Sequence, residues 1–333
     1  MLRSSLFLGL FLAITSLFAQ VPRTIVVEHF TNTRCGICAS RNPAFLNNVN
    51  SQDSVLHLTF HPSAPYSSCI HSLHNPSGND TRTNFYGVYG GTPRLVIQGE
   101  VVSAGANYGS SAIFDPYRSA TSPASLRIEQ NKDADSLRVR VIVKTEEAHS
   151  LGNLRLMVAA VEDTIFYQAP NGESEQLNVF RRALGDVEGD PWVLPTNVGD
   201  SIVFTATIAN HPDWDVDHIY VMAILQDESS KEILQASASA VSDDNLTMTT
   251  SVESELGSIS FEYFPNPVQD MLNVRLLDSR EAEVSLYRLT GQMIMKKSFT
   301  QETQLDFSEL ASGIYLLQLR NEKGQVIRRI VRR

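Results

Sequence analysis

Alternating and helical patterns of apolar residues follow one another in the N-terminal part of the chain. Residues 24–29 form a β-branched run, residues 39–49 repeat apolar side chains at helical spacing, and residues 54–60 alternate as a second strand. A polar insertion over 61–84, with a short helix expected near its centre, precedes a glycine-rich turn and an apolar strand over 95–97. This order of strands and helices predicts an α/β fold.

Further along the chain the pattern changes to short strands separated by turn-rich segments, which is typical of a β-sandwich. Near-continuous apolar runs mark 154–162 and 219–227 as central strands. The segment 178–185, NVFRRALG, is expected in a loop-rich region, where Arg181 and Arg182 are either solvated or bind an anion or partner. A non-catalytic role in binding or in positioning the first domain is expected here. The expected strands are 125–130, 136–145, 154–163, 201–208 and 218–227.

The C-terminal part reads as a small, Ig-like β-sandwich. Residues 242–258 are rich in Ser, Thr, Asp and Glu and predict a linker. Residues 259–333 contain segments that alternate apolar and polar side chains, such as 271–276 and 314–319, and predict about seven strands. Thr290-Gly291-Gln292 is expected to form a hairpin turn.

Residues 1–19 combine a positively charged Arg3, a short apolar run and small residues near Ala19, which is the pattern of a secretory signal peptide. A transmembrane anchor is the alternative, but the run is short for a span and no basic cluster follows it. We therefore expect an exported mature chain without a transmembrane segment. The net charge of the 333 residues is −10, and basic residues are not concentrated on any expected face, so nucleic acid is not an expected partner.

Cys35 and Cys38 are the most informative residues for chemistry. Gly36 and Ile37 separate them, and the predicted helix begins where they end. Cys35 is therefore expected at a helix N-terminus, where free N–H groups and the helix dipole lower the pKa of a thiol and favour the thiolate. The pattern favours a redox pair over a structural disulfide or a metal site, because the three cysteines are too few for a disulfide scaffold and no second ligand pair has zinc-site spacing.

Several neighbours of this pair leave alternatives open. Arg34 either lowers the pKa of Cys35 further or is a solvated charge. The third cysteine, Cys69, is a spare buried residue, an intermolecular link or a third redox partner. The nearby histidines are expected to be polar loop residues rather than metal ligands, and they are His61, His71 and His74.

The first hundred residues resemble the thioredoxin superfamily, and the resemblance covers roughly 24–100. The CGIC sequence matches the family's CGPC with Ile37 in place of proline, Pro43 matches its helix-kinking proline, and Thr92-Pro93 matches its cis-proline dipeptide. The resemblance implies an α/β thioredoxin-like fold for this part of the chain.

The same resemblance implies roles for individual residues. Cys35 would attack a substrate disulfide, Cys38 would resolve the mixed disulfide, and the backbone before Pro93 would pair with an extended substrate, with Thr92 and Pro93 forming the platform. Many members also carry a buried acid that relays protons to the second cysteine. Glu28 either takes this role or is a surface-strand glutamate. No dissociable cofactor is implied, because electrons come from another thiol pair.

The C-terminal part closely resembles the type A C-terminal sorting domain of the type IX secretion system. The matching pieces are YFPNP at 263–267, LTGQ at 289–292 and SGIY at 312–315. The resemblance implies export through the Sec system and then across the outer membrane by the type IX machinery, often with removal of the domain. A permanent structural module is the alternative.

The order of the parts, with NVFRRALG and VMAILQDESSKEILQA in the middle, resembles the Omp28-related exported proteins of Bacteroidetes. That family's name implies an association with the outer membrane. The expected division is a signal peptide at 1–19, a thioredoxin-like domain at 20–117, a β-sandwich at 118–241, a linker at 242–258 and the sorting domain at 259–333.

The sequence therefore suggests a secreted or cell-surface thiol–disulfide oxidoreductase that acts on protein disulfides through its CxxC pair. A non-enzymatic cell-surface binding protein on a thioredoxin-like scaffold is the alternative. A weaker third hypothesis is a metal-handling protein that uses Cys35, Cys38 and the neighbouring histidines.

Overall fold

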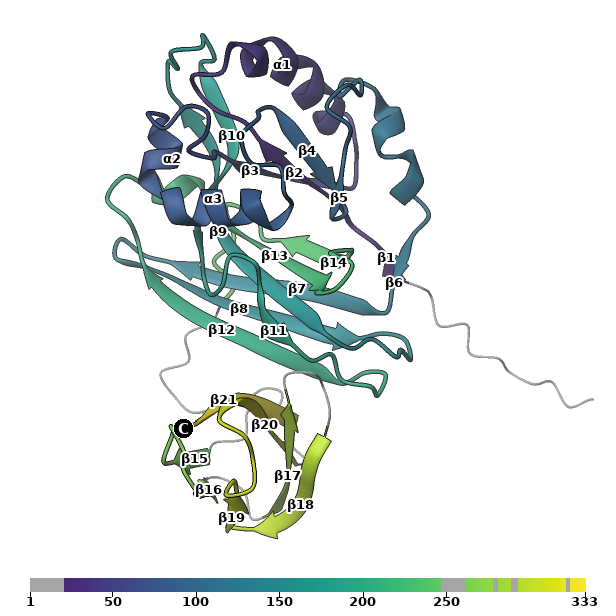
Figure 1. Cartoon of the computed structure of the whole chain (residues 1–333), viewed down its shortest axis with the longest axis vertical. Coiled ribbons are helices and arrows are strands. Elements are labelled where there is room, and N and C mark those ends of the chain that lie inside the picture. Colours follow the sequence, from purple (N-terminus) through teal and green to yellow (C-terminus); the bar gives the residue numbers. More distant parts are fainter. Residues whose placement is uncertain (1–20, 247–260, 278–280, 289–292, 322–323) are drawn as a thin grey trace, which may run out of the picture.

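The computed structural model describes residues 21–246, 261–277, 281–288, 293–321 and 324–333. The expected signal peptide, most of the expected linker and the hairpin turn expected at 290–292 lie outside the described residues. Within them the chain is mostly β, with few helices and several sheets (Figure 1).

The N-terminal part places two helices on opposite faces of a small group of strands. β2 runs parallel to β3 and antiparallel to β4, α1 covers one face, and α3 covers the other (Figure 1). The predicted insertion contains α2, as expected, and also α3. The bounds are β2 Ile25–Phe30, α1 Gly36–Asn50, β3 Val55–Phe60, α2 Ile70–His74, α3 Pro76–Phe85, β4 Arg94–Ile97 and β5 Glu100–Val101.

Strands from both the first and the second part of the chain join in one nine-stranded sheet. β10 lies antiparallel beside β9 and parallel beside β3, where Val179 is opposite Thr59. The predicted boundary between residues 117 and 118 therefore separates strands that share a single sheet. The remaining strands of this sheet are β9 Leu154–Phe166, β10 Glu175–Ala183, β11 Asp190–Trp192, β13 Ile219–Asp227 and β14 Ile233–Ala238.

Residues 178–183 of the segment 178–185 belong to β10 rather than to the loop that we expected. Its polar composition obscured the strand in the sequence. Arg181 is buried, and its Nε donates a hydrogen bond of 2.6 Å to the buried carboxylate of Glu162. Arg182, in contrast, is exposed. Burial raises the pKa of Glu162, and the adjacent guanidinium opposes that shift. Pairing with β9 and β3 thus decides the conformation of a segment whose sequence is not strand-like.

A second sheet packs on β9 and β13 to form the predicted sandwich. Along β9, Leu156, Val158 and Ala160 face this second sheet, whereas the alternate residues Met157 and Ala159 face the N-terminal core. Burial of both faces explains the near-continuous apolar run of this central strand. The second sheet contains β7 Ala124–Lys132, β8 Ser136–Thr145 and β12 Ser201–Ala209.

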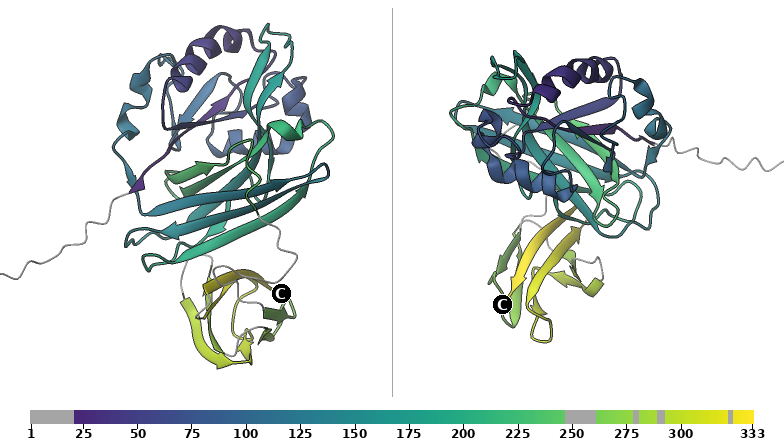
Figure 2. Two further views of the ribbon diagram at one scale, coloured as in Figure 1. Left: turned by 180° about the vertical axis from the view of Figure 1, so that it is seen from behind. Right: turned by 45° about the horizontal axis from the view of Figure 1, so that its top comes forward.

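The C-terminal part is a separate two-sheet unit with its own core, and seven strands lie in its described residues. Figure 2 shows it on the far side of the second sheet from the N-terminal helices. A guanidinium nitrogen of Arg320 in this unit lies 3.6 Å from a carboxylate oxygen of Asp200, the residue before β12. The strands are β15 Phe261–Phe264, β16 Met271–Leu276, β17 Glu281–Arg288, β18 Met293–Thr300, β19 Glu302–Asp306, β20 Gly313–Asn321 and β21 Gly324–Arg332.

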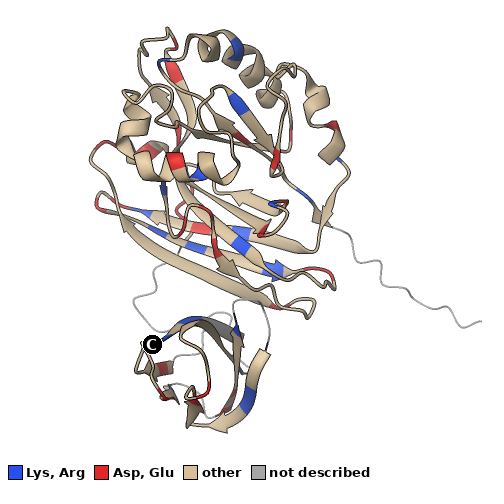
Figure 3. Ribbon diagram, viewed as in Figure 1, with Lys and Arg blue, Asp and Glu red and all other residues tan. Residues whose placement is uncertain are grey.

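Short elements complete the described chain. They are β1 Val21–Pro22, β6 Thr121–Ser122 and the 3₁₀ turns η1 Ser111–Ile113, η2 Asp115–Tyr117 and η3 Val216–His218. No helix in the part of the chain that the structure describes is long and apolar enough to cross a membrane. Figure 3 shows basic and acidic residues interspersed along the ribbon.

Candidate redox site

Cys35 and Cys38 are joined by a disulfide at the N-terminus of α1. Cys35 is the N-cap residue, with extended backbone dihedrals, and its Sγ accepts a hydrogen bond of 3.0 Å from the N–H of Cys38. The disulfide thus lies at the end of the helix where free N–H groups point outward. The same N–H group can stabilise a thiolate on Cys35 when the disulfide is reduced.

The turn before β4 faces this disulfide. The Thr92–Pro93 peptide bond is cis, and the carbonyl oxygen of Thr92 lies 3.6 Å from Sγ of Cys35. Pro93 is buried, and Thr92 is half-buried. The structure therefore brings together the four residues that the sequence singled out for the exchange reaction, from positions nearly sixty residues apart in the chain.

Exposure differs sharply within the motif. Cys35 is 2% exposed and Cys38 is fully buried, whereas Ile37 between them is 64% exposed. Gly36 and Arg34 are also exposed, and Nε of Arg34 donates a hydrogen bond of 3.0 Å to the carbonyl of Ser68. The surface of the motif is thus formed by its non-cysteine residues, and both sulfurs lie beneath it.

The inner face of α1 is a regular stripe. Cys38, Asn42, Phe45 and Val49 are buried, whereas Pro43 lies inside the helix on its exposed side. Residues at spacings of three and four share one helix face, so Asn42 and Phe45 lie directly below Cys38 along the axis. These residues pack on the face of the sheet formed by Ile25, Val27 and His29 of β2.

Glu28 lies on the opposite face of β2 and is neither a surface residue nor, among the described contacts, a neighbour of the cysteines. Its carboxylate is fully buried and accepts hydrogen bonds from Arg82 at 2.7 and 3.1 Å and from the hydroxyl of Tyr86 at 2.5 Å. The Glu28 carboxylate raises the pKa of Arg82 against the effect of burial, and burial raises the pKa of Tyr86. This group is a buried ion pair that ties α3 to the sheet.

His29, rather than Glu28, is the polar residue of β2 that faces α1. Its ring centroid is 4.7 Å from that of Phe45, and neither ring nitrogen has a hydrogen-bond partner in the described structure. Burial, with smaller contributions from His57 and His61, lowers the pKa of His29 well below 6.5, although Asn42 raises it somewhat. The period-two alternation of β2, in phase with Ile25 and Val27, would have identified this residue from the sequence.

Of the three histidines expected as polar loop residues, His61 and His71 are buried and His74 is half-buried. His61 is fully buried, His71 is 2% exposed, and their ring centroids are 4.7 Å apart. Burial lowers the pKa of His57 and of His71 to about 3, and it lowers the pKa of His61 well below 6.5. These imidazoles are therefore neutral at ordinary pH.

Cys69 is a free, fully buried thiol at the start of α2. The hydroxyl of Thr33 donates a hydrogen bond of 3.2 Å to its sulfur. Complete burial fits the interpretation as a spare buried residue and leaves no exposed sulfur for an intermolecular link in this conformation.

Three potential metal ligands converge away from the CxxC pair. His74, His211 and Asp213 direct one ligand atom each toward a common point, with His74 Nδ1 3.9 Å from the carboxylate of Asp213. However, the indole N–H of Trp214 donates a hydrogen bond of 2.9 Å to Nε2 of His74, which places the proton of the neutral ring on Nδ1. A metal-bound histidine has the reverse arrangement, so this group fits a metal ion poorly.

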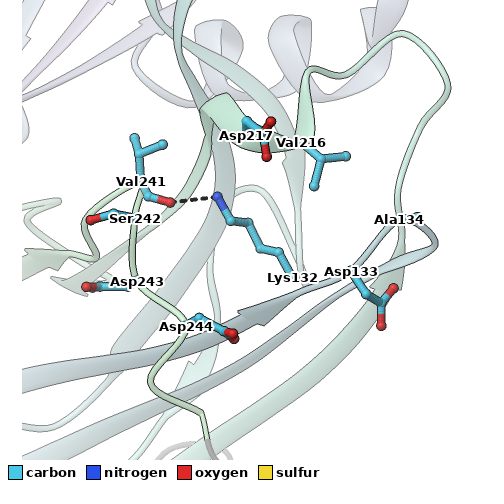
Figure 4. Close-up of a pocket in the computed structure, with 9 residues that line it drawn as sticks. All are labelled: Lys132, Asp133, Ala134, Val216, Asp217, Val241, Ser242, Asp243 and Asp244. Carbon is cyan, nitrogen blue, oxygen red and sulfur yellow. Dashed lines mark hydrogen bonds between the residues drawn. The ribbon is translucent and has the colours of Figure 1, made fainter.

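A cavity of about 690 Å³ lies near the ends of β7 and β8 (Figure 4). Its wall is acidic, and the ammonium of Lys132 donates hydrogen bonds to the carbonyls of Ile219 and Val241 at 2.8 and 2.6 Å. Because backbone carbonyls engage this lysine, its ammonium is not free to bind a ligand in the cavity. The acidic lining residues are Asp133, Asp217, Asp243 and Asp244.

Comparisons with known proteins bear on the chain as a whole. The family model for the secretion system C-terminal sorting domain matches residues 262–333. No curated protein matches the sequence. HBP35 of Porphyromonas gingivalis is similar in structure, at 16% sequence identity and a TM-score of 0.56, over 93% of this chain and 98% of HBP35. A domain of the outer membrane lipoprotein Omp28 from Porphyromonas gingivalis aligns at 17% identity and a TM-score of 0.27, over 35% of this chain and 86% of that domain.

The sorting-domain match confirms the resemblance seen at the C-terminus, and it indicates secretion or a cell-surface location. The likeness to HBP35 concerns the fold, which is shared over nearly the whole chain. Residues 262–333 match the family of secretion system C-terminal sorting domains, and the chain is consistent with an Omp28-related exported protein of Bacteroidetes.

Proposed function

We propose that the chain is an exported thiol–disulfide oxidoreductase with a thioredoxin-like N-terminal domain, acting on protein disulfides through Cys35 and Cys38. One observation carries the proposal: the Cys35–Cys38 disulfide caps α1 and lies 3.6 Å from the carbonyl before the cis-proline. A helix N-terminus lowers the pKa of a thiol, and a free backbone carbonyl beside it can pair with an extended substrate.

The exchange follows from these positions. In the reducing direction the Cys35 thiolate attacks one sulfur of a substrate disulfide, and the other substrate sulfur leaves as a thiolate that takes up a proton. Cys38 then loses its proton and attacks Cys35, which restores the Cys35–Cys38 disulfide and releases the second substrate thiol. The oxidising direction is the reverse, and the reduction potential of the pair decides between them.

Under this proposal, His29 is the group on the α1 side of β2 that takes up the proton of Cys38, and it holds the proton only briefly, because burial lowers its pKa well below 6.5. Cys38, Asn42 and Phe45 form one stripe of α1, and His29 lies against Asn42 and Phe45 with a neutral ring and no hydrogen-bond partner in the described structure. Glu28 does not suit this role, because Arg82 and Tyr86 occupy its carboxylate on the other face of the sheet.

The test is reduction of insulin disulfides, and isomerisation of scrambled disulfides, by the purified exported chain. We expect activity in the wild type and its loss in Cys35→Ser. The matched control is Cys69→Ser, which removes the other cysteine side chain and should retain activity. Equal behaviour of the wild type and Cys35→Ser would refute the proposal.

A second candidate function is binding without turnover, and the burial of both sulfurs supports it. In that case the disulfide is structural, and the surface formed by Arg34, Gly36 and Ile37 makes contacts without exchange. The variant Cys35→Ser separates the two candidates. A binding protein keeps its affinity for a partner in this variant, whereas a disulfide oxidoreductase loses its turnover.

A further inference from the structure

The connection between β9 and β10, residues 167–174, lies against the start of α1, and we refer to it as the cover. The N–H of Tyr167 donates to the carbonyl of Ser174 at 3.0 Å, which closes the base of the hairpin. The hairpin extends beyond the rest of the sheet to the level of α1 (Figure 1). Asn171 occupies its tip, between hydrogen-bonded Ala169 and Gly172.

Asn171 binds the backbone of the segment that carries the first cysteine. Its N–H donates to the carbonyl of Thr33 at 3.1 Å, and its side-chain Nδ2 donates to the carbonyls of Asn32 at 3.3 Å and Cys35 at 3.2 Å. A single residue of the second part of the chain therefore bonds three carbonyls around the CxxC motif, two of which also accept from the N–H groups of Cys35 and Ala39.

Glu173 fastens the cover to α1 itself. Its carboxylate accepts a hydrogen bond of 2.7 Å from Nδ2 of Asn42 and one of 2.6 Å from Nδ2 of Asn171. Asn42 belongs to the buried stripe directly below Cys38. The cover is thus held on both sides of the disulfide, at the turn before the helix and on the helix.

Exchange requires an incoming sulfur to approach a cysteine sulfur in line with the S–S bond. With the cover in this position Cys35 is 2% exposed and Cys38 is fully buried, although Ile37 between them is 64% exposed. The cover fastens the turn that carries Cys35 and the buried face of α1, so its release would loosen the backbone around the disulfide.

We propose that the cover selects the substrates of the oxidoreductase, admitting disulfides in extended polypeptide segments and excluding those held in folded proteins. The inference rests on the proposed function. Moving Asn171 leaves the carbonyl of Thr33 without its donor, whereas the carbonyls of Asn32 and Cys35 keep the N–H groups of Cys35 and Ala39 as donors. Backbone N–H groups of an extended chain can take the place of the Asn171 donors, whereas those of a folded protein are already paired.

Two variants open the cover in different ways. Asn171→Ala removes the side-chain bonds to Asn32 and Cys35. A shortened variant replaces residues 168–173 with Asn-Gly, the preferred two-residue turn for a hairpin whose base is already paired. The matched control is Asn197→Ala, which removes the same side chain from an exposed position that bonds only to nearby Asp200 in the described structure.

The first measurement is the rate at which dithiothreitol reduces the Cys35–Cys38 disulfide. Two thiols of the reagent become a cyclic disulfide, and the protein disulfide gains two electrons and two protons. We expect Asn171→Ala to react about tenfold faster than the wild type, the factor for losing one or two net hydrogen bonds. The shortened variant should react faster still, and Asn197→Ala should match the wild type.

The second measurement compares scrambled ribonuclease A, whose chain is unfolded, with the native protein, which has the same composition and number of disulfides. The wild type should exchange only with the scrambled form, and the shortened variant should react with both. Equal dithiothreitol rates in all variants, or wild-type exchange with both forms alike, would overturn the role of the cover. If opening the cover speeds dithiothreitol reduction but no variant exchanges with either form, the oxidoreductase function itself fails, and the selection with it.

Discussion

The two faces of β2 carry adjacent polar residues in opposite situations. Glu28 faces α3, where Arg82 and Tyr86 bond both of its carboxylate oxygens. His29 faces α1, where its neutral ring has no hydrogen-bond partner among the described residues. On the Glu28 face, loss of either partner leaves a buried charge unpaired, whereas His29 is the group that takes up a proton below the CxxC helix under the proposed function. The strand face, rather than the chemical type of the residue, therefore distinguishes the two environments.

The largest expected effect lies on the Glu28 face and concerns stability. Arg82→Leu leaves a buried carboxylate without its cation, so we expect the free energy of unfolding to fall by about 3–5 kcal/mol. Urea denaturation followed by circular dichroism measures it. Arg182→Leu, at an exposed position, should change the stability by less than about 0.5 kcal/mol. Similar losses in the two variants would remove the distinction between this face and the surface.

The next effect lies on the His29 face and concerns rate. His29→Phe keeps an aromatic ring against Phe45 but removes the proton acceptor, so we expect disulfide exchange at neutral pH to slow about a hundredfold. The matched variant Glu28→Gln should weaken folding but leave the rate of the folded protein nearly unchanged. A slower rate in Glu28→Gln than in His29→Phe would reverse the assignment of the two faces.

Acid should weaken the histidine-rich side of the sheet. Burial lowers the pKa of His57 and His71 to about 3, and an unfolded histidine titrates near 6.5. Their neutral burial therefore contributes full stability above pH 6.5, and this contribution falls as the pH drops from 6.5 toward 3, by up to about 1.4 kcal/mol per pH unit for each histidine.

Urea midpoints at pH 8, 6 and 5 measure this dependence. His71→Gln should flatten the slope by the share of one histidine. A stability that does not vary between pH 8 and 5 would contradict the neutral state of these rings.

The smallest expected effect comes from the C-terminal unit. It has its own core, and the ion pair between Arg320 and Asp200 is exposed at 3.6 Å, so it contributes at most about 1 kcal/mol. A chain that ends at residue 246 should keep the unfolding midpoint and the exchange rate that residues 21–246 have in the full chain. A clear loss of either would show that the sorting domain supports the face that carries the disulfide.

Local sequence signals predicted much of this molecule. The succession of short strands predicted β8 over 136–145, near-continuous apolar runs predicted β9 and β13 as central strands of the sandwich, and the CxxC pair was correctly expected at the start of a helix. The Thr92–Pro93 dipeptide lies beside Cys35, as the resemblance implied. These features depend on neighbouring residues or on motifs with a fixed geometry.

The features that escaped prediction depend on residues far apart in the chain. β10 lacks a strand-like pattern, because a buried Arg181–Glu162 pair and the partners β9 and β3 decide its conformation. Its pairing with β3 also brings the cover to the disulfide. The burial of Glu28 became evident only with Arg82, which lies on a helix 54 residues away. Charge pairing across such distances leaves no periodic signal in the sequence.

The midpoint potential of the Cys35–Cys38 pair tests the central claim most directly. The purified chain is equilibrated with thiol buffers of known potential, and the reduced fraction is measured by alkylation and mass spectrometry. A redox site should give a reversible midpoint between about −270 and −120 mV, the range of exchange-active pairs. A midpoint below about −300 mV, where structural disulfides lie, would contradict the account.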